Sequence, residues 1–127
     1  MLFMKKVLIG GKFNQVHPGH LWLLKKAKKL GYLIVVLAHE KHNKRTYSVS
    51  SKLRKKNLEK FRLADKVVVG SSSGFVGVVK KYKPDVIVLG YDQKLPDRVT
   101  SDYVKMQKIK ILRFKKHGKY STRKLNL

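Results

Sequence analysis

Two histidines near the amino terminus are the residues of this chain best suited to carry chemistry. They stand in the stretch from Ile9 to His20, which reads I-G-G-K-F-N-Q-V-H-P-G-H. Because His17 and His20 are three residues apart, they can project the same way at the start of a helix. Their imidazoles, together with the free N–H groups of a first helical turn, can hold the oxygens of a polyphosphate. The alternative is that one histidine caps the helix and the other is a surface residue.

The elements on either side of this stretch would hold it in place. Met4–Ile9 is a short apolar run that predicts a strand, and Gly10 and Gly11 allow backbone geometries that a side chain forbids. A ligand can therefore come close to bare backbone amides there. A proline that suits the first helical position, followed by apolar residues at every third or fourth position, predicts a helix over residues 18–30.

The composition predicts one folded domain. The chain has 127 residues, of which 43% are hydrophobic, so we expect a core and a single domain over residues 1–127. No apolar run is long enough to cross a membrane, which predicts a cytoplasmic protein without membrane contact. The chain has no cysteine and no third histidine or carboxylate at ligand spacing near the two histidines, so we expect no metal site built on protein ligands.

Basic residues are spread over the whole chain. Lysine and arginine number 31 against 7 aspartates and glutamates, which gives a net charge of +24. Such a field attracts phosphates of every kind, but the sequence does not interleave aromatic and basic residues as single-strand binders do. We therefore expect nucleic acid to bind through non-specific charge only, and most basic residues to lie on solvated helix faces.

Strand and helix patterns alternate along the rest of the chain. We expect strands at Tyr32–Ala38, Lys66–Val69, Val86–Leu89 and Lys110–Phe114, and helices from Ser51 to about Arg62, from Phe75 to Tyr82, and from Pro96 onward. This order implies an α/β fold in which a five-stranded parallel sheet has helices on both faces.

Two connections of this sheet predict functional loops. The segment from His39 to Ser50 is basic, long and without periodicity, and contains Lys44 and Arg45. A second connection, Gly90 to Gln93, follows a buried strand directly. It would lie at the carboxyl edge of the sheet, where open α/β sheets bind ligands.

The stretch from Gly11 to His20 resembles the G-x-F-D-x-x-H-x-G-H motif of the cytidylyltransferase-like nucleotidyltransferases, which have a Rossmann-like (HUP-type) fold. Phe13, His17 and Gly19 are in register with the motif. Asn14 replaces the usual aspartate and Lys12 a common threonine. Asn14 can still form hydrogen bonds but supplies no charge.

The resemblance implies roles for further residues. The loop lysine Lys44 would reach the phosphates with the two histidines, Arg54 would face the site from an element similar to E-x-R, and Gly90-Tyr91-Asp92-Gln93 would approach the sugar and base. The tail from Tyr120 to Leu125 is similar to the family's I-S-S-T-K-I element. The residues that the resemblance assigns to nucleotide binding are Gly10, Gly11, Lys12, Phe13, Asn14, Gly19, Arg54, Gly90, Asp92, Gln93, Lys116 (or Arg113 in its place), Tyr120, Ser121 and Thr122, and those assigned to catalysis are His17, His20 and Lys44.

The sequence around Asp92, L-G-x-D-Q, is similar to that of archaeal FAD synthetases. The resemblance therefore implies transfer of AMP from ATP to FMN, with Mg²⁺ accompanying the nucleotide, release of pyrophosphate and a homodimeric enzyme. The first alternative is a cytidylyltransferase that activates glycerol 3-phosphate or another alcohol phosphate with CTP. The second is a non-enzymatic protein that binds nucleotides or nucleic acid.

Overall fold

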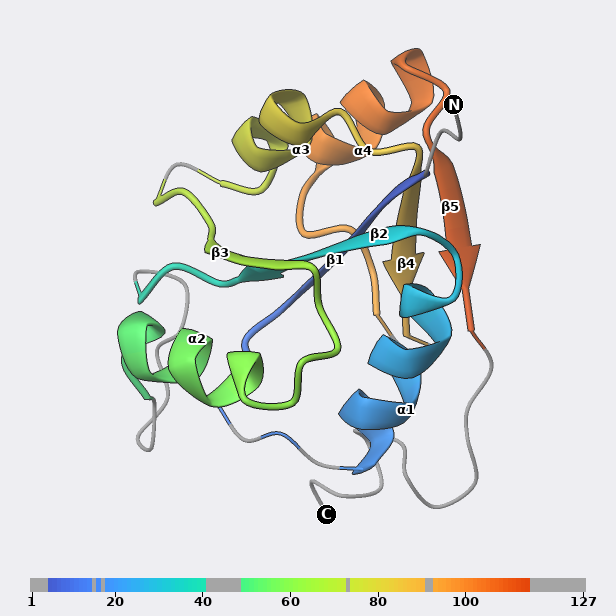
Figure 1. The fold of residues 1–127 in the computed structure, drawn as a ribbon. Helices are drawn as coiled ribbons and strands as arrows, with labels where there is room; N and C mark the ends of the chain where they lie inside the picture. The colour runs from blue at the N-terminus through green and yellow to red at the C-terminus, as the bar shows by residue number, and fades with distance from the viewer. Residues whose placement is uncertain are drawn as a thin grey trace.

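The protein is an α/β fold in which one parallel sheet lies between two pairs of helices (Figure 1). This computed structural model describes residues 5–14, 16, 18–40, 49–72, 74–90 and 93–114. The strands are β1 (Lys6–Gly11), β2 (Tyr32–Leu37), β3 (Lys66–Val69), β4 (Val86–Leu89) and β5 (Lys110–Arg113). The helices are α1 (Pro18–Lys28), α2 (Ser51–Glu59), α3 (Val76–Tyr82) and α4 (Arg98–Met106). No helix in the described part of the chain is long and apolar enough to cross a membrane.

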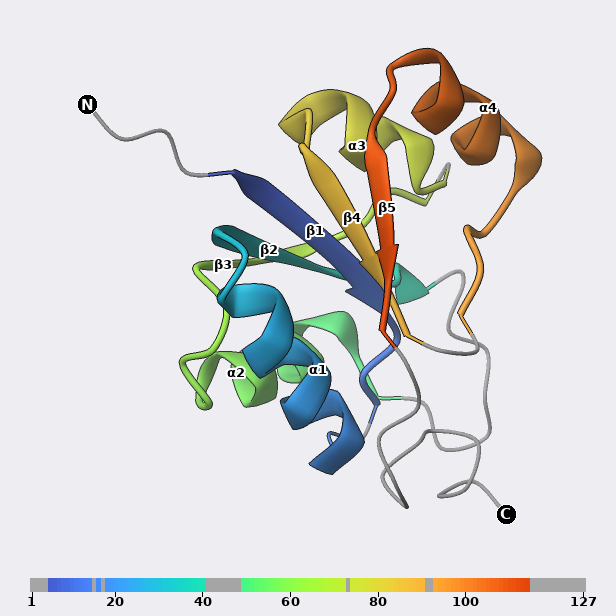
Figure 2. The ribbon, with the colours of Figure 1, turned by 90° about the vertical axis from the view of Figure 1, so that its right-hand side faces the viewer.

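The strand order β3-β2-β1-β4-β5 confirms the predicted five-stranded parallel sheet. The strands β2 to β4 are apolar because the sheet is covered on both faces. One core layer joins β1 and β2 to Leu24 and Ala27 of α1 and Leu58 of α2. The other joins the opposite face to α3 and α4, and Figure 2 shows the two helix pairs on opposite sides of the sheet.

The chain order reverses between β1 and β4, which places a switch point at the carboxyl edge of the sheet. Figure 2 shows the arrowheads of β1, β4 and β5 converging at this edge. The described residues that follow β1 and β4 therefore lie close together at the edge where the sequence predicted a ligand site.

Several element boundaries differ from the prediction by one to three residues, and two of them lie beside the candidate site. Gly10 and Gly11 do not turn out of the first strand but are its last residues, and they pair with Val36 and Leu37 of β2. The strand continues because its neighbour still offers ladder partners there. The fourth helix begins at Arg98 rather than at the proline, because the side chain of the preceding aspartate accepts the N–H of Thr100 and caps the helix.

Two aspartates of the same design secure the amino ends of the strands. Asp65, just before β3, accepts the N–H of Leu33 at 2.8 Å, and Asp85, just before β4, accepts the N–H of Lys6 at 2.8 Å. Burial raises the pKa of Asp65, but its hydrogen bonds with the Lys28 ammonium and the Leu33 N–H outweigh burial and hold the pKa below its ordinary value. Both carboxylates are therefore occupied in strand alignment.

We predict that Gly31→Ala destabilises the fold. Gly31 precedes β2, and a Cβ there would lie 2.2 Å from the carbonyl oxygen of Lys5, which accepts the N–H of Tyr32 at 2.8 Å. Relief of this overlap requires a backbone shift, so we expect a loss of about 2 kcal/mol in the free energy of unfolding. Urea denaturation measures it.

Gly77→Ala is the matched control. Gly77 lies in α3, and the place that a Cβ would take there has no other atom within 4 Å. Because alanine is the better helix former, this variant should gain about 0.5 to 1 kcal/mol. Equal stability of the two variants would contradict the packing described for residue 31.

Candidate active site

The carboxyl end of β1 lies between two aromatic rings. A Cβ at Gly10 would approach Cε1 of Phe75 to 3.0 Å on the α3 side of the sheet. A Cβ at Gly11 would approach Cε2 of Phe13 to 2.7 Å on the α1 side. The two rings fill the space that side chains at these positions would take, so the glycines let the rings pack against the end of β1.

Phe13 also positions one of the predicted histidines. Its backbone has φ +50°, a turn that brings its ring back to the core, where it is 8% exposed. The ring centroid lies 5.0 Å from that of His20, with the planes tilted by 56°. His20 stands in the first turn of α1, beside Gly19, and this turn carries no acidic residue. The arrangement places an imidazole and the positive end of a helix next to the end of β1, as an anion site requires.

Arg54 of α2 is the most deeply buried charged residue of the site, at 1% exposure. Its guanidinium donates to three backbone carbonyls: that of Lys12 after β1 at 2.8 Å, that of Ala38 after β2 at 2.8 Å, and that of Val49 before α2 at 2.7 Å. Burial lowers the pKa of Arg54, and the Glu40 carboxylate opposes that shift. The side chain therefore fastens three loops of the site to one another.

Two further contacts secure the same region. Asn14, the residue that replaces the family aspartate, accepts the N–H of Val49 at 3.0 Å through Oδ1. Glu40 accepts both the N–H and the hydroxyl of Ser51, at 2.8 and 3.0 Å, and these bonds hold the pKa of Glu40 below its ordinary value. An amide at residue 14 thus has a structural partner that does not depend on charge.

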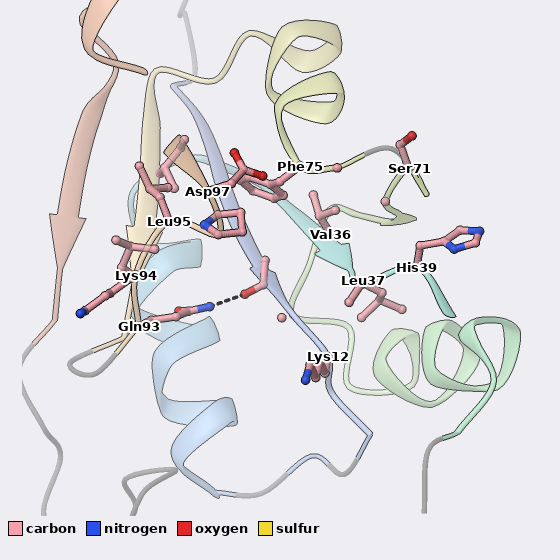
Figure 3. Close-up of a pocket in the computed structure, with 18 residues that line it drawn as sticks. Lys12, Val36, Leu37, His39, Ser71, Phe75, Gln93, Lys94, Leu95 and Asp97 are labelled. Carbon is pink, nitrogen blue, oxygen red and sulfur yellow. Dashed lines mark hydrogen bonds between the residues drawn. The ribbon is translucent and has the colours of Figure 1, made fainter. Parts of the chain in front are cut away.

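The loop after β4 is held to β1 by a side chain. Gln93 donates from Nε2 to the carbonyl oxygen of Gly10 at 2.7 Å and accepts the N–H of Gly90 at 3.0 Å (Figure 3). Arg113, at the end of β5, donates to the carbonyl of Gly90 at 2.9 Å and to that of Gln93. Gly90 and Gln93 of the predicted loop therefore lie directly beside Gly10 at the end of β1.

A hollow of about 480 Å³ opens beside these loops on the α3 side of the sheet. Figure 3 shows Phe75, Leu95 and Val36 around it, with Lys12 and Lys94 at its rim. Its volume is in the range of small-molecule sites, and polar side chains such as Ser71 and Asp97 stand around its apolar walls, as is usual for such sites.

The described residues that the sequence assigned to the site lie at the carboxyl edge of the sheet, but not all in one hollow. Gly10, Gly11, Lys12 and Gln93 line the hollow on the α3 side, whereas Phe13, Gly19 and His20 lie on the α1 side. Asn14, Arg54 and Gly90 bond to the loops between them. The remaining predicted residues lie outside the described part of the chain: His17, Lys44, Asp92, Lys116, Tyr120, Ser121 and Thr122. Within the described ranges no three histidine, aspartate or glutamate residues cluster closely enough to hold a metal ion.

Sequence reasoning misses the apolar wall of the hollow. It predicts Phe75 only as the first residue of a helix and does not single out Leu95. The small-residue turn that precedes Phe75 reads as a plain connection, but Gly70, Ser71 and Gly74 also line the hollow. The sequence signal for this wall is an aromatic residue, Phe75, that directly follows a turn of small residues at the carboxyl end of a strand.

We predict that Arg54→Lys destabilises the protein although it keeps the charge. A lysine cannot present a planar fork to three carbonyls, so at least one buried acceptor loses its donor, at about 1 to 3 kcal/mol for each. Urea denaturation measures the loss. The exposed Arg98→Lys is the control, and its effect should stay within about 0.5 kcal/mol. If both variants unfold alike, the three carbonyl contacts do not hold the loops.

Comparison with known proteins identifies the family. The family model described as cytidylyltransferase-like matches residues 8–123. The FAD synthase of Ferroglobus placidus is 36% identical over 110 residues, covering 84% of this chain and 72% of the relative. The FAD synthase of Aciduliprofundum boonei is 33% identical over 121 residues, covering 91% and 81%.

Solved structures agree with the predicted fold. The lipopolysaccharide core biosynthesis protein from Thermoplasma volcanium superposes with a TM-score of 0.77 at 30% identity, covering 91% of this chain and 99% of that chain. The pantoate-beta-alanine ligase from Francisella tularensis, with a TM-score of 0.63 at 18% identity, covering 98% and 66%, shares the fold. The predicted Rossmann-like fold and nucleotidyltransferase class are therefore confirmed, and the chain belongs to the cytidylyltransferase-like family of nucleotidyltransferases.

Proposed function

We propose that this enzyme is an FMN adenylyltransferase, which transfers AMP from ATP to the phosphate of FMN and releases FAD and pyrophosphate. The observation that carries this choice is the apolar hollow beside the phosphate-binding turn. The FAD synthases among the relatives support the same choice.

The hollow suits a flat apolar ring better than a small polyol. Its walls include Phe75, Leu95 and Leu89, and a flavin ring would bury its area against them. Glycerol 3-phosphate could use only the polar side chains of the hollow and would leave these apolar walls in water. The flavin of FMN therefore occupies the α3 side of the sheet in this proposal.

The adenine nucleotide would then lie on the other side of the glycines, toward α1. Gly90 borders that side, since a Cβ there would lie 3.7 Å from Cδ2 of Leu23 of α1. The two substrates would thus approach from opposite sides and bring their phosphates together over Gly10 and Gly11.

The chemical step is in-line transfer of the adenylyl group. An oxygen of the FMN phosphate attacks the α-phosphorus of ATP, the new O–P bond forms as the bond to the β-phosphate oxygen breaks, and pyrophosphate leaves. The transition state gathers negative charge, which His20, Lys12 and the N–H groups of the first turn of α1 would stabilise. In this proposal His17 and Lys44 act with them.

Magnesium enters as part of the substrate. In this proposal Mg²⁺ arrives with ATP, held by its phosphate oxygens. The homodimer and the cytoplasmic location expected from the sequence stay predictions.

The direct test is to incubate the purified protein with Mg²⁺, ATP and FMN and to separate the flavins by chromatography. We expect FAD and an equal amount of pyrophosphate, with CTP a poor replacement for ATP. His20→Ala should lower the turnover number by about 10²- to 10³-fold because the imidazole faces charge that forms in the transition state. Pyrophosphate from CTP and glycerol 3-phosphate, with none from ATP and FMN, would instead establish the cytidylyltransferase alternative.

A second prediction tests the flavin pocket. Phe75→Leu keeps an apolar wall but removes the aromatic ring, so the KM for FMN should rise about three- to tenfold while the KM for ATP stays unchanged. Steady-state kinetics with each substrate varied in turn measures both constants.

Phe61→Leu is the matched control, since Phe61 is 44% exposed beyond the end of α2 and lies outside the hollow. It should change neither constant. An equal rise in both KM values for Phe75→Leu would place the flavin elsewhere.

A further inference from the structure

The amino edge of the sheet, opposite the active site, is strongly basic. Each of the four described helices has at least one lysine in its last turn. Three of the strands also begin at a lysine: Lys6, Lys66 and Lys110. Because all strands run parallel, these strand starts and helix ends lie at one edge of the molecule.

The helix macrodipole explains only part of this pattern. A lysine in a last helical turn is stabilised by the negative end of the dipole. Strands have no comparable dipole, so the lysines at the strand starts have no such local reason. The nearby acids are too few to neutralise them all: Asp65 pairs with Lys28 at 2.8 Å, and Asp85 accepts the N–H of Lys6.

Two of these lysines line a shallow groove together with two tyrosines. The groove measures about 370 Å³ and is formed by Lys6, Tyr32, Ile34, Lys66 and Tyr82. Lys6 pairs in register with Tyr32, and Lys66 with Ile34. Side chains alternate along a strand, so Lys6, Tyr32 and Lys66 lie on the face that carries α3.

Tyr82, the last residue of α3, holds the cations of the groove in place. Its carbonyl oxygen accepts a hydrogen bond from Nζ of Lys6 at 3.2 Å. Nζ of Lys66 lies 5.3 Å from the centre of its ring and Nζ of Lys81 lies 5.5 Å from it. Tyr32, at 36% exposure, forms the opposite wall, so an aromatic ring open to solvent stands among positioned ammonium groups.

We propose that this groove binds single-stranded nucleic acid. The lysines contact the phosphates and Tyr32 stacks on a base, the combination by which proteins hold single strands without reading their sequence. A folded chain thus supplies the interleaved aromatic and basic groups that are far apart in the sequence, at residues 6, 32, 66 and 82. This function does not depend on adenylyl transfer, which occurs at the opposite edge.

Fluorescence anisotropy with labelled RNA and DNA of mixed sequence tests the proposal, with inorganic polyphosphate as the competitor that has no bases. For about three phosphate contacts, the dissociation constant of a strand of about 12 nucleotides should rise about tenfold between about 50 and about 150 mM salt. Comparison of the two strands shows whether the 2′-hydroxyl matters.

Lys66→Glu should weaken binding about tenfold and flatten the salt dependence. Lys52→Glu makes the same change of net charge on α2, outside the groove, and should weaken binding less than about threefold. Both lysines are exposed, so both variants should fold, and their adenylyl-transfer activity should match that of the wild type. Equal weakening by the two substitutions would overturn the groove as the binding site.

Tyr32→Leu separates stacking from charge. It should weaken the binding of RNA and DNA about fivefold or more while leaving the binding of polyphosphate unchanged. Unchanged nucleic-acid affinity in this variant would overturn the stacking role and with it the proposal. Absence of FAD synthesis by the wild-type protein would refute the proposed activity alone and would leave this result standing.

Discussion

The active-site edge depends on one buried cation. Arg54 donates to the carbonyls of the residues that directly follow β1 and β2 and to a carbonyl that precedes α2. Carbonyls at the ends of strands have left their ladder, and burial without a donor would cost each of them about 1 to 3 kcal/mol. A guanidinium can satisfy all three at once, because it carries five donors in a rigid plane.

The opposite wall of the site uses the same device with different side chains. Gln93 bridges the ends of β1 and β4. Arg113 donates to the carbonyls of Gly90 and Gln93, which follow β4. Side-chain donors thus replace the missing strand ladder on both sides of Gly10 and Gly11. This leaves the glycines themselves free of side chains while the backbone around them stays fixed, which is the preorganisation that transition-state stabilisation requires.

The fold could be predicted from the sequence because the spacing of apolar residues within each segment indicates whether that segment is a helix or a strand. The boundaries predicted for Lys66–Val69 and Val86–Leu89 are those observed, since each apolar run is bounded by turn residues. The family motif also brought Arg54 to attention, but as a nucleotide ligand. Its carbonyl partners could not be predicted, because Lys12 is 42 residues away and Ala38 is 16 residues away. Contacts of that range depend on how loops pack, which periodicity does not encode.

The scarcity of acids links the fold to the basic groove. With 7 carboxylates against 31 cations, pairwise neutralisation is unattainable for most lysines. Asp65 and Asp85 bind the N–H groups that begin β2 and β1, so they align strands first and offset charge second. Asp65 also pairs with Lys28, but so few carboxylates leave most of the described lysines at this edge without an acidic partner, and Tyr82 gathers Lys66 and Lys81 over its ring. The parallel sheet thus separates the candidate active site at its carboxyl edge from a cationic surface at its amino edge.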